Sequence, residues 1–149
     1  MSSNKTSSHG SAYFYPDSDY ARRAIGCLVE LQARAGGNAL IGRSLYPLLS
    51  DAGFGDVQVS PRMVYVDSSK PDLVEGFTRK TFTAMIEGVR QSSLESMIVS
   101  EAAFDRGIAD LYRTAEADGV FCYTFFKARA VNSFNAEQPS PANRLQARR

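Results

Sequence analysis

The stretch Gly119–Lys127, with the sequence GVFCYTFFK, decides how we expect the rest of the chain to be arranged. Alternate side chains of a strand point to opposite faces, so Phe121, Tyr123 and Phe125 share one face and the residues between them share the other. Both faces are mostly apolar, which is typical of a strand that is covered on two sides. The stretch has no proline and is rich in aromatic and β-branched residues, so it predicts an interior strand with neighbours at both edges.

Composition excludes several classes of protein. The 149 residues are 44% hydrophobic and 22% charged, values typical of one globular domain. A net charge of +1 and the absence of a basic run give no reason to expect nucleic acid as a partner. The apolar runs are far shorter than the roughly 20 residues of a membrane-spanning helix, and the polar start has no signal-peptide core. We therefore expect a cytoplasmic protein in which Cys27 and Cys122 are buried thiols rather than a disulfide.

The chain divides into a disordered arm (1–11), a single domain (12–130) and a disordered tail (131–149), because both ends are polar and the tail contains prolines. Besides the final strand, the domain contains only one convincing strand, Asp56–Asp67. Pro61 within it lacks a backbone donor and therefore favours an edge position or a bulge.

Four helices are predicted from apolar residues spaced three and four apart. Their expected ranges are 19–35, 41–52, 71–91 and 101–115. Asp17 or Ser18 caps the first helix and Ser100 caps the last, because their side-chain oxygens accept hydrogen bonds from first-turn amides. Pro47 favours either a start of the second helix near Ser44 or a kink in that helix. A polar link is expected between the third and fourth helices.

Several segments resemble class I S-adenosylmethionine-dependent methyltransferases. Leu45–Val59 (LYPLLSDAGFGDVQV) resembles their last helix and penultimate strand, and residues 119–127 resemble their last strand. Ser8–Asp17 (SHGSAYFYPD) looks like the loop after the fifth strand in the quinone-biosynthesis branch, and helix 19–35 then looks like a lid over the substrate cleft. The resemblance covers about residues 8–130. It implies an α/β fold, α+β for the isolated chain, with helices packed on a small and mainly antiparallel sheet that resembles the C-terminal edge of a Rossmann-like fold.

The cofactor-binding half of such enzymes is missing from this sequence. They hold the cofactor with a Gly-rich loop after the first strand and an acidic residue after the second. This chain has no G-x-G-x-x-G motif, and its only G-x-G, Gly53–Gly55, follows a predicted helix and is interpreted as a turn. We therefore expect no cofactor to be bound by this chain alone, and S-adenosylmethionine only when an N-terminal half completes the site.

Two functions remain open. The chain is either the substrate-side part of a methyltransferase, inactive alone, or a non-enzymatic small-molecule-binding or protein-interaction homodimer derived from that fold. In the resembling fold the last strand lies between the fifth and sixth strands and is antiparallel to both. An unpaired edge beside aromatic surface is costly, so the second edge of this strand needs a partner. This edge can pair with Ala12–Tyr15, with a strand of a second copy, or with a cofactor-binding chain. Of these we favour a two-fold homodimer.

Four residues are candidates for substrate binding, and no catalytic or metal-binding residue is predicted. His9 is the only histidine, which leaves no second histidine for a metal site or a catalytic triad. The resemblance implies that it acts near the substrate as a base or hydrogen-bond donor, and the simpler interpretation is an exposed residue. Tyr13 and Tyr15 either line an aromatic substrate cleft or pack beneath the lid helix. Arg43 either holds an anionic group of a small-molecule ligand or is solvated.

Overall fold

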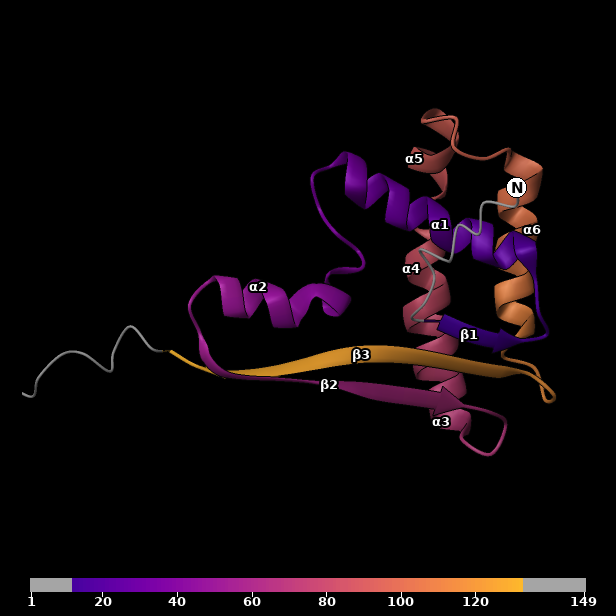
Figure 1. Cartoon of the computed structure of the whole chain (residues 1–149). Helices are drawn as coiled ribbons and strands as arrows, with labels where there is room; N and C mark the ends of the chain where they lie inside the picture. The colour runs from indigo at the N-terminus through magenta and orange to yellow at the C-terminus, as the bar shows by residue number, and fades with distance from the viewer. Residues whose placement is uncertain (1–11, 133–149) are drawn as a thin grey trace, which may run out of the picture. The chain divides into compact units, whose positions relative to one another are not determined.

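The computed structural model describes residues 12–132, so the predicted arm and the tail from residue 133 lie outside the described residues. The strands are β1 (Ala12–Tyr15), β2 (Gly55–Val66) and β3 (Val120–Val131), as Figure 1 shows. The helical segments are α1 (Asp19–Arg34), η1 (Ile41–Ser44), α2 (Leu45–Asp51), α3 (Pro71–Leu73), η2 (Val74–Thr83), α4 (Ala84–Glu87), α5 (Arg90–Glu95) and α6 (Glu101–Arg113).

Two compact units form within this part of the chain. The first contains the described residues up to Ile41 together with Pro61–Phe125, and the second contains Gly42–Ser60 together with the residues from Phe126. The first unit therefore holds β1, α1 and the helices from α3 to α6. In the second unit the backbone of Gly42 packs so closely against Phe126 that an added Cβ would lie 2.6 Å from its ring.

β3 is the middle strand of a three-stranded sheet with the order β1–β3–β2 in the described part of the chain. The sheet is antiparallel, which confirms an α+β arrangement with a small antiparallel sheet. Ala12 lies opposite Tyr123, and Tyr15 lies opposite Val120. Ala12–Tyr15 is thus a strand, and it is the partner that pairs with the second edge of β3 over these residues. β2 lies at the edge, as Pro61 predicted.

The side chains of β3 are covered on both faces only near its beginning. Phe121 and Cys122 point to opposite faces and are both buried, whereas Phe125 is 47% exposed. The prediction of a strand covered on two sides is therefore confirmed for its first residues and wrong at Phe125. Alternating apolar residues indicate that both faces can be buried, but not how far the neighbouring helices extend along the strand.

Phe121 is at the centre of an aromatic cluster that holds the helices on one face of the sheet. Its ring centroid lies 4.6 Å from that of Phe82, 6.1 Å from that of Phe77 and 6.4 Å from that of Phe14. Phe77 and Phe82 belong to η2, which crosses behind the strands in Figure 1. Each aromatic pair adds about 0.5–1.5 kcal/mol to the stabilisation from burial, so this cluster is a main link between helices and sheet.

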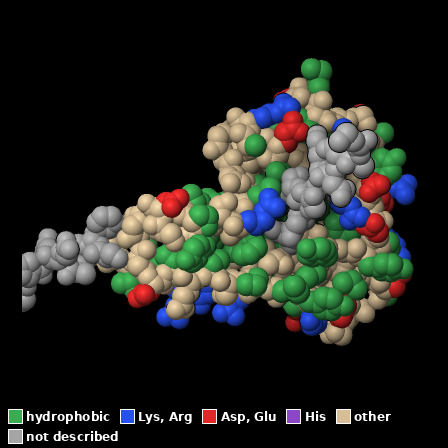
Figure 2. Space-filling model, viewed as in Figure 1, with side chains coloured by type: hydrophobic (Ala, Val, Ile, Leu, Met, Phe, Trp, Pro, Cys, Tyr) green, Lys and Arg blue, Asp and Glu red, His purple; other side chains and the backbone are tan. Residues whose placement is uncertain are grey.

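The other face of the sheet is less well covered in the first unit. Val64 and Val66 of β2 pack into the core, so the alternating Met63 and Tyr65 point away from it. Met63 and Tyr65 are 66% and 45% exposed. Figure 2 shows hydrophobic side chains gathered over the strands of this unit.

α1 and α6 pack closely because small residues meet where they cross. Ala24 of α1 is fully buried, and Gly107 of α6 lies against the backbone of α1. A Cβ at residue 107 would be 2.4 Å from the carbonyl oxygen of Tyr20. Ser18, which caps α1 as predicted, also donates a 2.6 Å hydrogen bond to the Asp110 carboxylate of α6.

The helical region after Pro71 differs from the single helix predicted over 71–91. It consists of α3, the π-helical η2 and α4, and α4 ends at Glu87. In η2 the Thr81 hydroxyl donates to the Gly76 carbonyl five residues earlier, which matches the wider turn of a π-helix. Apolar spacing did not predict this turn, because the prediction assumed α-helical spacing, and the local pattern does not contain the tertiary packing that favours a π-helical turn.

The remaining helices follow the predictions except at α5. Residues 41–52 form η1 and α2, with Pro47 in the first turn of α2. α6 begins after its cap, Ser100. α5 extends into the stretch that was predicted to be a polar link, where Ser93 is fully buried. The Ser93 hydroxyl donates to the carbonyl of Val89, so this polar side chain is satisfied inside the helix.

We expect Gly107→Ala to lower the free energy of unfolding by about 1–3 kcal/mol, because the new methyl group overlaps the Tyr20 carbonyl. Gly76→Ala is the matched control, since a Cβ there meets nothing within 4 Å. This control should leave the stability unchanged or raise it by up to about 1 kcal/mol. Urea denaturation of both variants measures the difference, and a Gly107→Ala protein as stable as the parent would contradict the close packing of α1 on α6.

Candidate functional site

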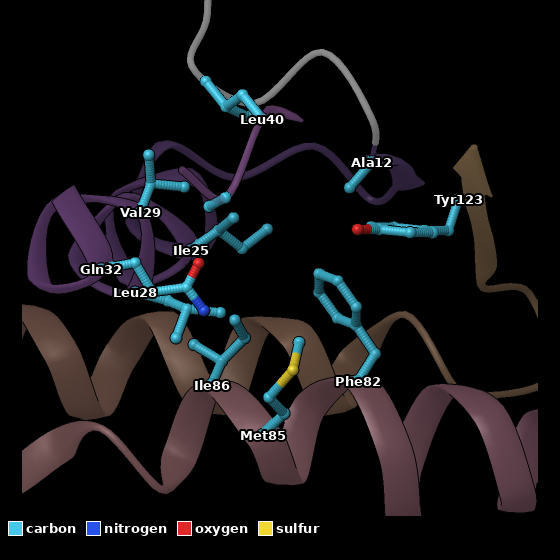
Figure 3. Close-up of a pocket in the computed structure, with 11 residues that line it drawn as sticks. Ala12, Ile25, Leu28, Val29, Gln32, Leu40, Phe82, Met85, Ile86 and Tyr123 are labelled. Carbon is cyan, nitrogen blue, oxygen red and sulfur yellow. The ribbon is translucent and has the colours of Figure 1, made fainter. Parts of the chain in front are cut away.

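An apolar cavity in the first unit lies between α1, the η2–α4 helix and β3 (Figure 3). Its volume is about 150 Å³. The residues that line it come from β1, α1, the segment after α1, η2, α4 and β3. They are Ala12, Ile25, Leu28, Val29, Gln32, Ala39, Leu40, Phe82, Met85, Ile86 and Tyr123.

Helical spacing explains how two walls of the cavity form. Residues 25, 28, 29 and 32 of α1 are separated by three and four positions, so they lie on one face of that helix. Phe82, Met85 and Ile86 are spaced in the same way across the junction of η2 and α4. Ala12 and Tyr123 share a face because they are directly opposite in the antiparallel register. The cavity is therefore a product of the helix faces and of the pairing of β1 with β3.

Among the described residues of the wall, only the Gln32 amide and the Tyr123 hydroxyl supply polar side-chain atoms, and none of these residues carries a charge. Figure 3 shows the Tyr123 hydroxyl directed into the cavity. It makes no hydrogen bond to another described residue. The Tyr123 ring is held by Phe125, at a centroid distance of 4.7 Å, and by Phe82, at 5.4 Å. The cavity thus presents one well-positioned hydroxyl in an apolar wall.

The three described residues among those that the sequence singled out do not line this cavity. Tyr13 and Tyr15 alternate with Ala12 and Phe14 along β1, and they are 60% and 58% exposed on its other face. They therefore neither line the cavity nor pack beneath α1. Arg43 is an exposed residue in the second unit.

His9 lies outside the described residues. Sequence reasoning missed Tyr123 and the lining face of α1 as site residues, although the spacing of 25, 28, 29 and 32 was visible. Tyr123 faces the cavity because of the register between β1 and β3. This register is a tertiary pairing that cannot be read from a local sequence pattern.

Two other hollows in the first unit contain charged side chains in their walls, and most of these side chains already have hydrogen-bond or ion-pair partners. In one of them, Arg90 binds Asp105 with an Nε–Oδ1 distance of 2.7 Å, and the Tyr112 hydroxyl donates to Glu87. In the other, Asp110 accepts hydrogen bonds from Arg106 and from the cap of α1. These hollows offer a ligand fewer free polar groups than their composition suggests, so the apolar cavity is the better candidate.

The described residues contain no Gly-rich loop that leads from a strand into a helix, the element that holds S-adenosylmethionine in the resembling family. Gly53–Gly55 joins α2 to β2, with Gly53 at φ 85°, and is the predicted turn rather than a loop that leads from a strand into a helix. Within residues 12–132, no group of three His, Cys, Asp or Glu side chains is placed to hold a metal ion. None of the described helices has the length and apolar character needed to cross a membrane.

Comparison with known proteins gives no relative: no protein-family model matches the chain, and no curated protein matches it.

The ion pair of Arg90 and Asp105 predicts a pH-dependent stability. The guanidinium holds the pKa of Asp105 below its usual value of 3.8, so the pair stabilises the fold above that pH and loses its effect as the pH falls through the folded-state pKa. We expect the difference in stability between the parent and Asp105→Asn to be constant from about pH 8 to about pH 5 and to shrink below about pH 4. Urea titrations at each pH measure it, with Asp51→Asn, which removes no described ion pair, as the control. A difference that persists undiminished to about pH 3 would argue against this pair.

The two cysteines are free and buried, as predicted. Burial raises the pKa of both Cys27 and Cys122, which keeps them in the less reactive thiol form. We expect a disulfide-exchange reagent at about pH 8 to label neither cysteine rapidly in the native protein and both in denaturant. Rapid labelling of the native chain, measured by mass spectrometry, would show that the core around α1 and β3 is not closed.

Proposed function

We propose that this chain forms the acceptor-binding side of an S-adenosylmethionine-dependent methyltransferase. The observation that carries the proposal is the position of β3 between two antiparallel neighbours. The resemblance implies this order and direction for the last strand, and β2 contains the segment that resembles the penultimate strand. β1 occupies the place of the fifth strand, although the resemblance assigns residues 8–17 to the loop after it. In a completed sheet, a true fifth strand would therefore compete with β1.

The cavity supports a role in binding an acceptor. One wall is α1, which the resemblance identifies as a lid over the substrate, and Tyr123 of the last strand points in from another side. Methyl transfer depends mainly on positioning the two reactants, so an acceptor side can work with an apolar wall and few polar groups. The proposal includes no catalytic residue in this chain, and it takes the donor-binding residues from the partner, because the described residues contain no Gly-rich loop between a strand and a helix.

The proposal requires a partner for the donor side. A Gly-rich half, supplied by a second chain or by additional sequence, would complete the enzyme in the cytoplasm. A homodimer is the other assembly that we propose. The pairing of β1 with Val120–Tyr123 favours neither assembly over the other, because the edge that a second copy or a cofactor-binding chain was expected to cover is already occupied over these residues.

A second candidate is a small-molecule-binding protein without transferase activity. The observation that favours it is the cavity itself, which forms from this chain without any donor-binding segment. The two candidates differ in whether the chain contributes to binding of a methyl donor.

Calorimetry with S-adenosylmethionine distinguishes them. Three proteins are compared: the 149-residue chain, the Gly-rich half of a class I methyltransferase, and the two joined at Ser8. We expect binding heat only from the joined protein, because each half lacks groups that the other supplies. A joined protein that unfolds cooperatively but binds no donor would overturn the methyltransferase proposal and leave the binding protein.

A further inference from the structure

We propose that the cavity between α1, the η2–α4 helix and β3 binds a small, uncharged ring compound that carries one oxygen, with the Tyr123 hydroxyl as its hydrogen-bond partner. The identity of this ligand as the methyl acceptor rests on the proposed function. The binding itself rests only on the cavity.

The volume and the apolar wall of the cavity determine the size and the apolar character of the ligand. Its volume is about 150 Å³, and an apolar cavity of about that volume accepts a benzene-sized molecule. Ile25, Phe82 and Ile86 supply buried apolar surface on two sides. Met85 is 45% exposed, so it lies where the cavity meets solvent, and its flexible thioether can move to admit a ring.

The absence of charge from the described part of the wall argues against ionised ligands. None of the described lining residues is Asp, Glu, Lys, Arg or His. A carboxylate or ammonium group would lose its hydration on entry and find no opposite charge, which costs several kcal/mol. A neutral ring avoids this cost and gains from the removal of its apolar surface from water.

Tyr123 supplies the single oriented polar contact. Its hydroxyl points into the cavity and makes no hydrogen bond to a described residue, so it is available to a ligand oxygen (Figure 3). Its ring is fixed by contacts with Phe82, Phe125 and Phe77. Gln32, the other polar group in the wall, is an exposed residue of α1 and is less constrained. The geometry therefore favours a ligand oxygen on the β3 side and the rest of the ring against α1 and α4.

The test is NMR of the methyl groups of the full 149-residue chain, titrated with three probes of similar size: p-cresol, toluene and benzoate. We expect p-cresol and toluene to shift the methyl resonances of Ile25, Ile86 and Met85 in a saturable manner, with p-cresol binding more tightly. Benzoate should produce no such shift, because its charge has no partner in the wall.

Three variants assign the contacts. Tyr123→Phe keeps the ring and should weaken p-cresol binding by about 2- to 12-fold, the effect of one hydrogen bond, while toluene binding is unchanged. Tyr13→Phe removes the same group from the opposite face of the sheet and should change neither affinity. Ala12→Leu places a larger side chain in the cavity and should weaken the binding of both neutral probes.

Three outcomes would overturn the inference. They are no saturable shift with either neutral probe, benzoate binding as tight as that of p-cresol, or an unchanged affinity of Tyr123→Phe for p-cresol. These measurements use the chain alone and no methyl donor. If the ring probes do not bind the chain, the result therefore says nothing about donor binding by the joined protein. If the joined protein does not bind the donor, that result likewise says nothing about binding of the ring probes.

Discussion

The pairing of β3 with a strand on each side is the constraint on which the first unit depends. Because β1 pairs in register with Val120–Tyr123, Phe14 stacks on Phe121 and both rings face the helices. The same register turns Tyr123 toward the cavity and Tyr13 away from it. A slip of one residue in β1 would exchange the two faces of that strand and place tyrosines where Ala12 and Phe14 now pack. The fold and the candidate site therefore depend on one set of backbone hydrogen bonds.

Features of the fold that have local causes could be predicted from the sequence. Ser18 and Ser100 cap their helices because a serine hydroxyl can accept from first-turn amides, and Pro61 marks an edge strand because it has no donor. The π-helical η2 and α5 could not be predicted, since their stability comes from tertiary packing. Ser93 looks like a residue of a polar link in the sequence, but its hydroxyl is satisfied by a backbone carbonyl within the helix.

The site was harder to predict because it depends on which faces of the helices and strands pack against one another. Aromatic composition pointed to Tyr13 and Tyr15, whereas the register of β1 places Tyr123 in the cavity wall. Of the three partners expected for the second edge of β3, the Ala12–Tyr15 strand of this chain is the one that pairs with Val120–Tyr123. The methyltransferase proposal is consequently supported by strand order and by the cavity rather than by an empty edge. In this proposal the donor side is supplied by a second chain or by additional sequence.

Native-state hydrogen exchange along β3 is the most direct test of the claim that this strand is interior. We expect the amides of Val120–Tyr123 that bond to a neighbouring strand to exchange only through global unfolding. Phe14→Pro, which removes a backbone donor from β1, should release the amides that face β1 and leave protected those that face β2. Rapid exchange of all four amides in the parent chain, or equal protection in the parent and the variant, would contradict the account.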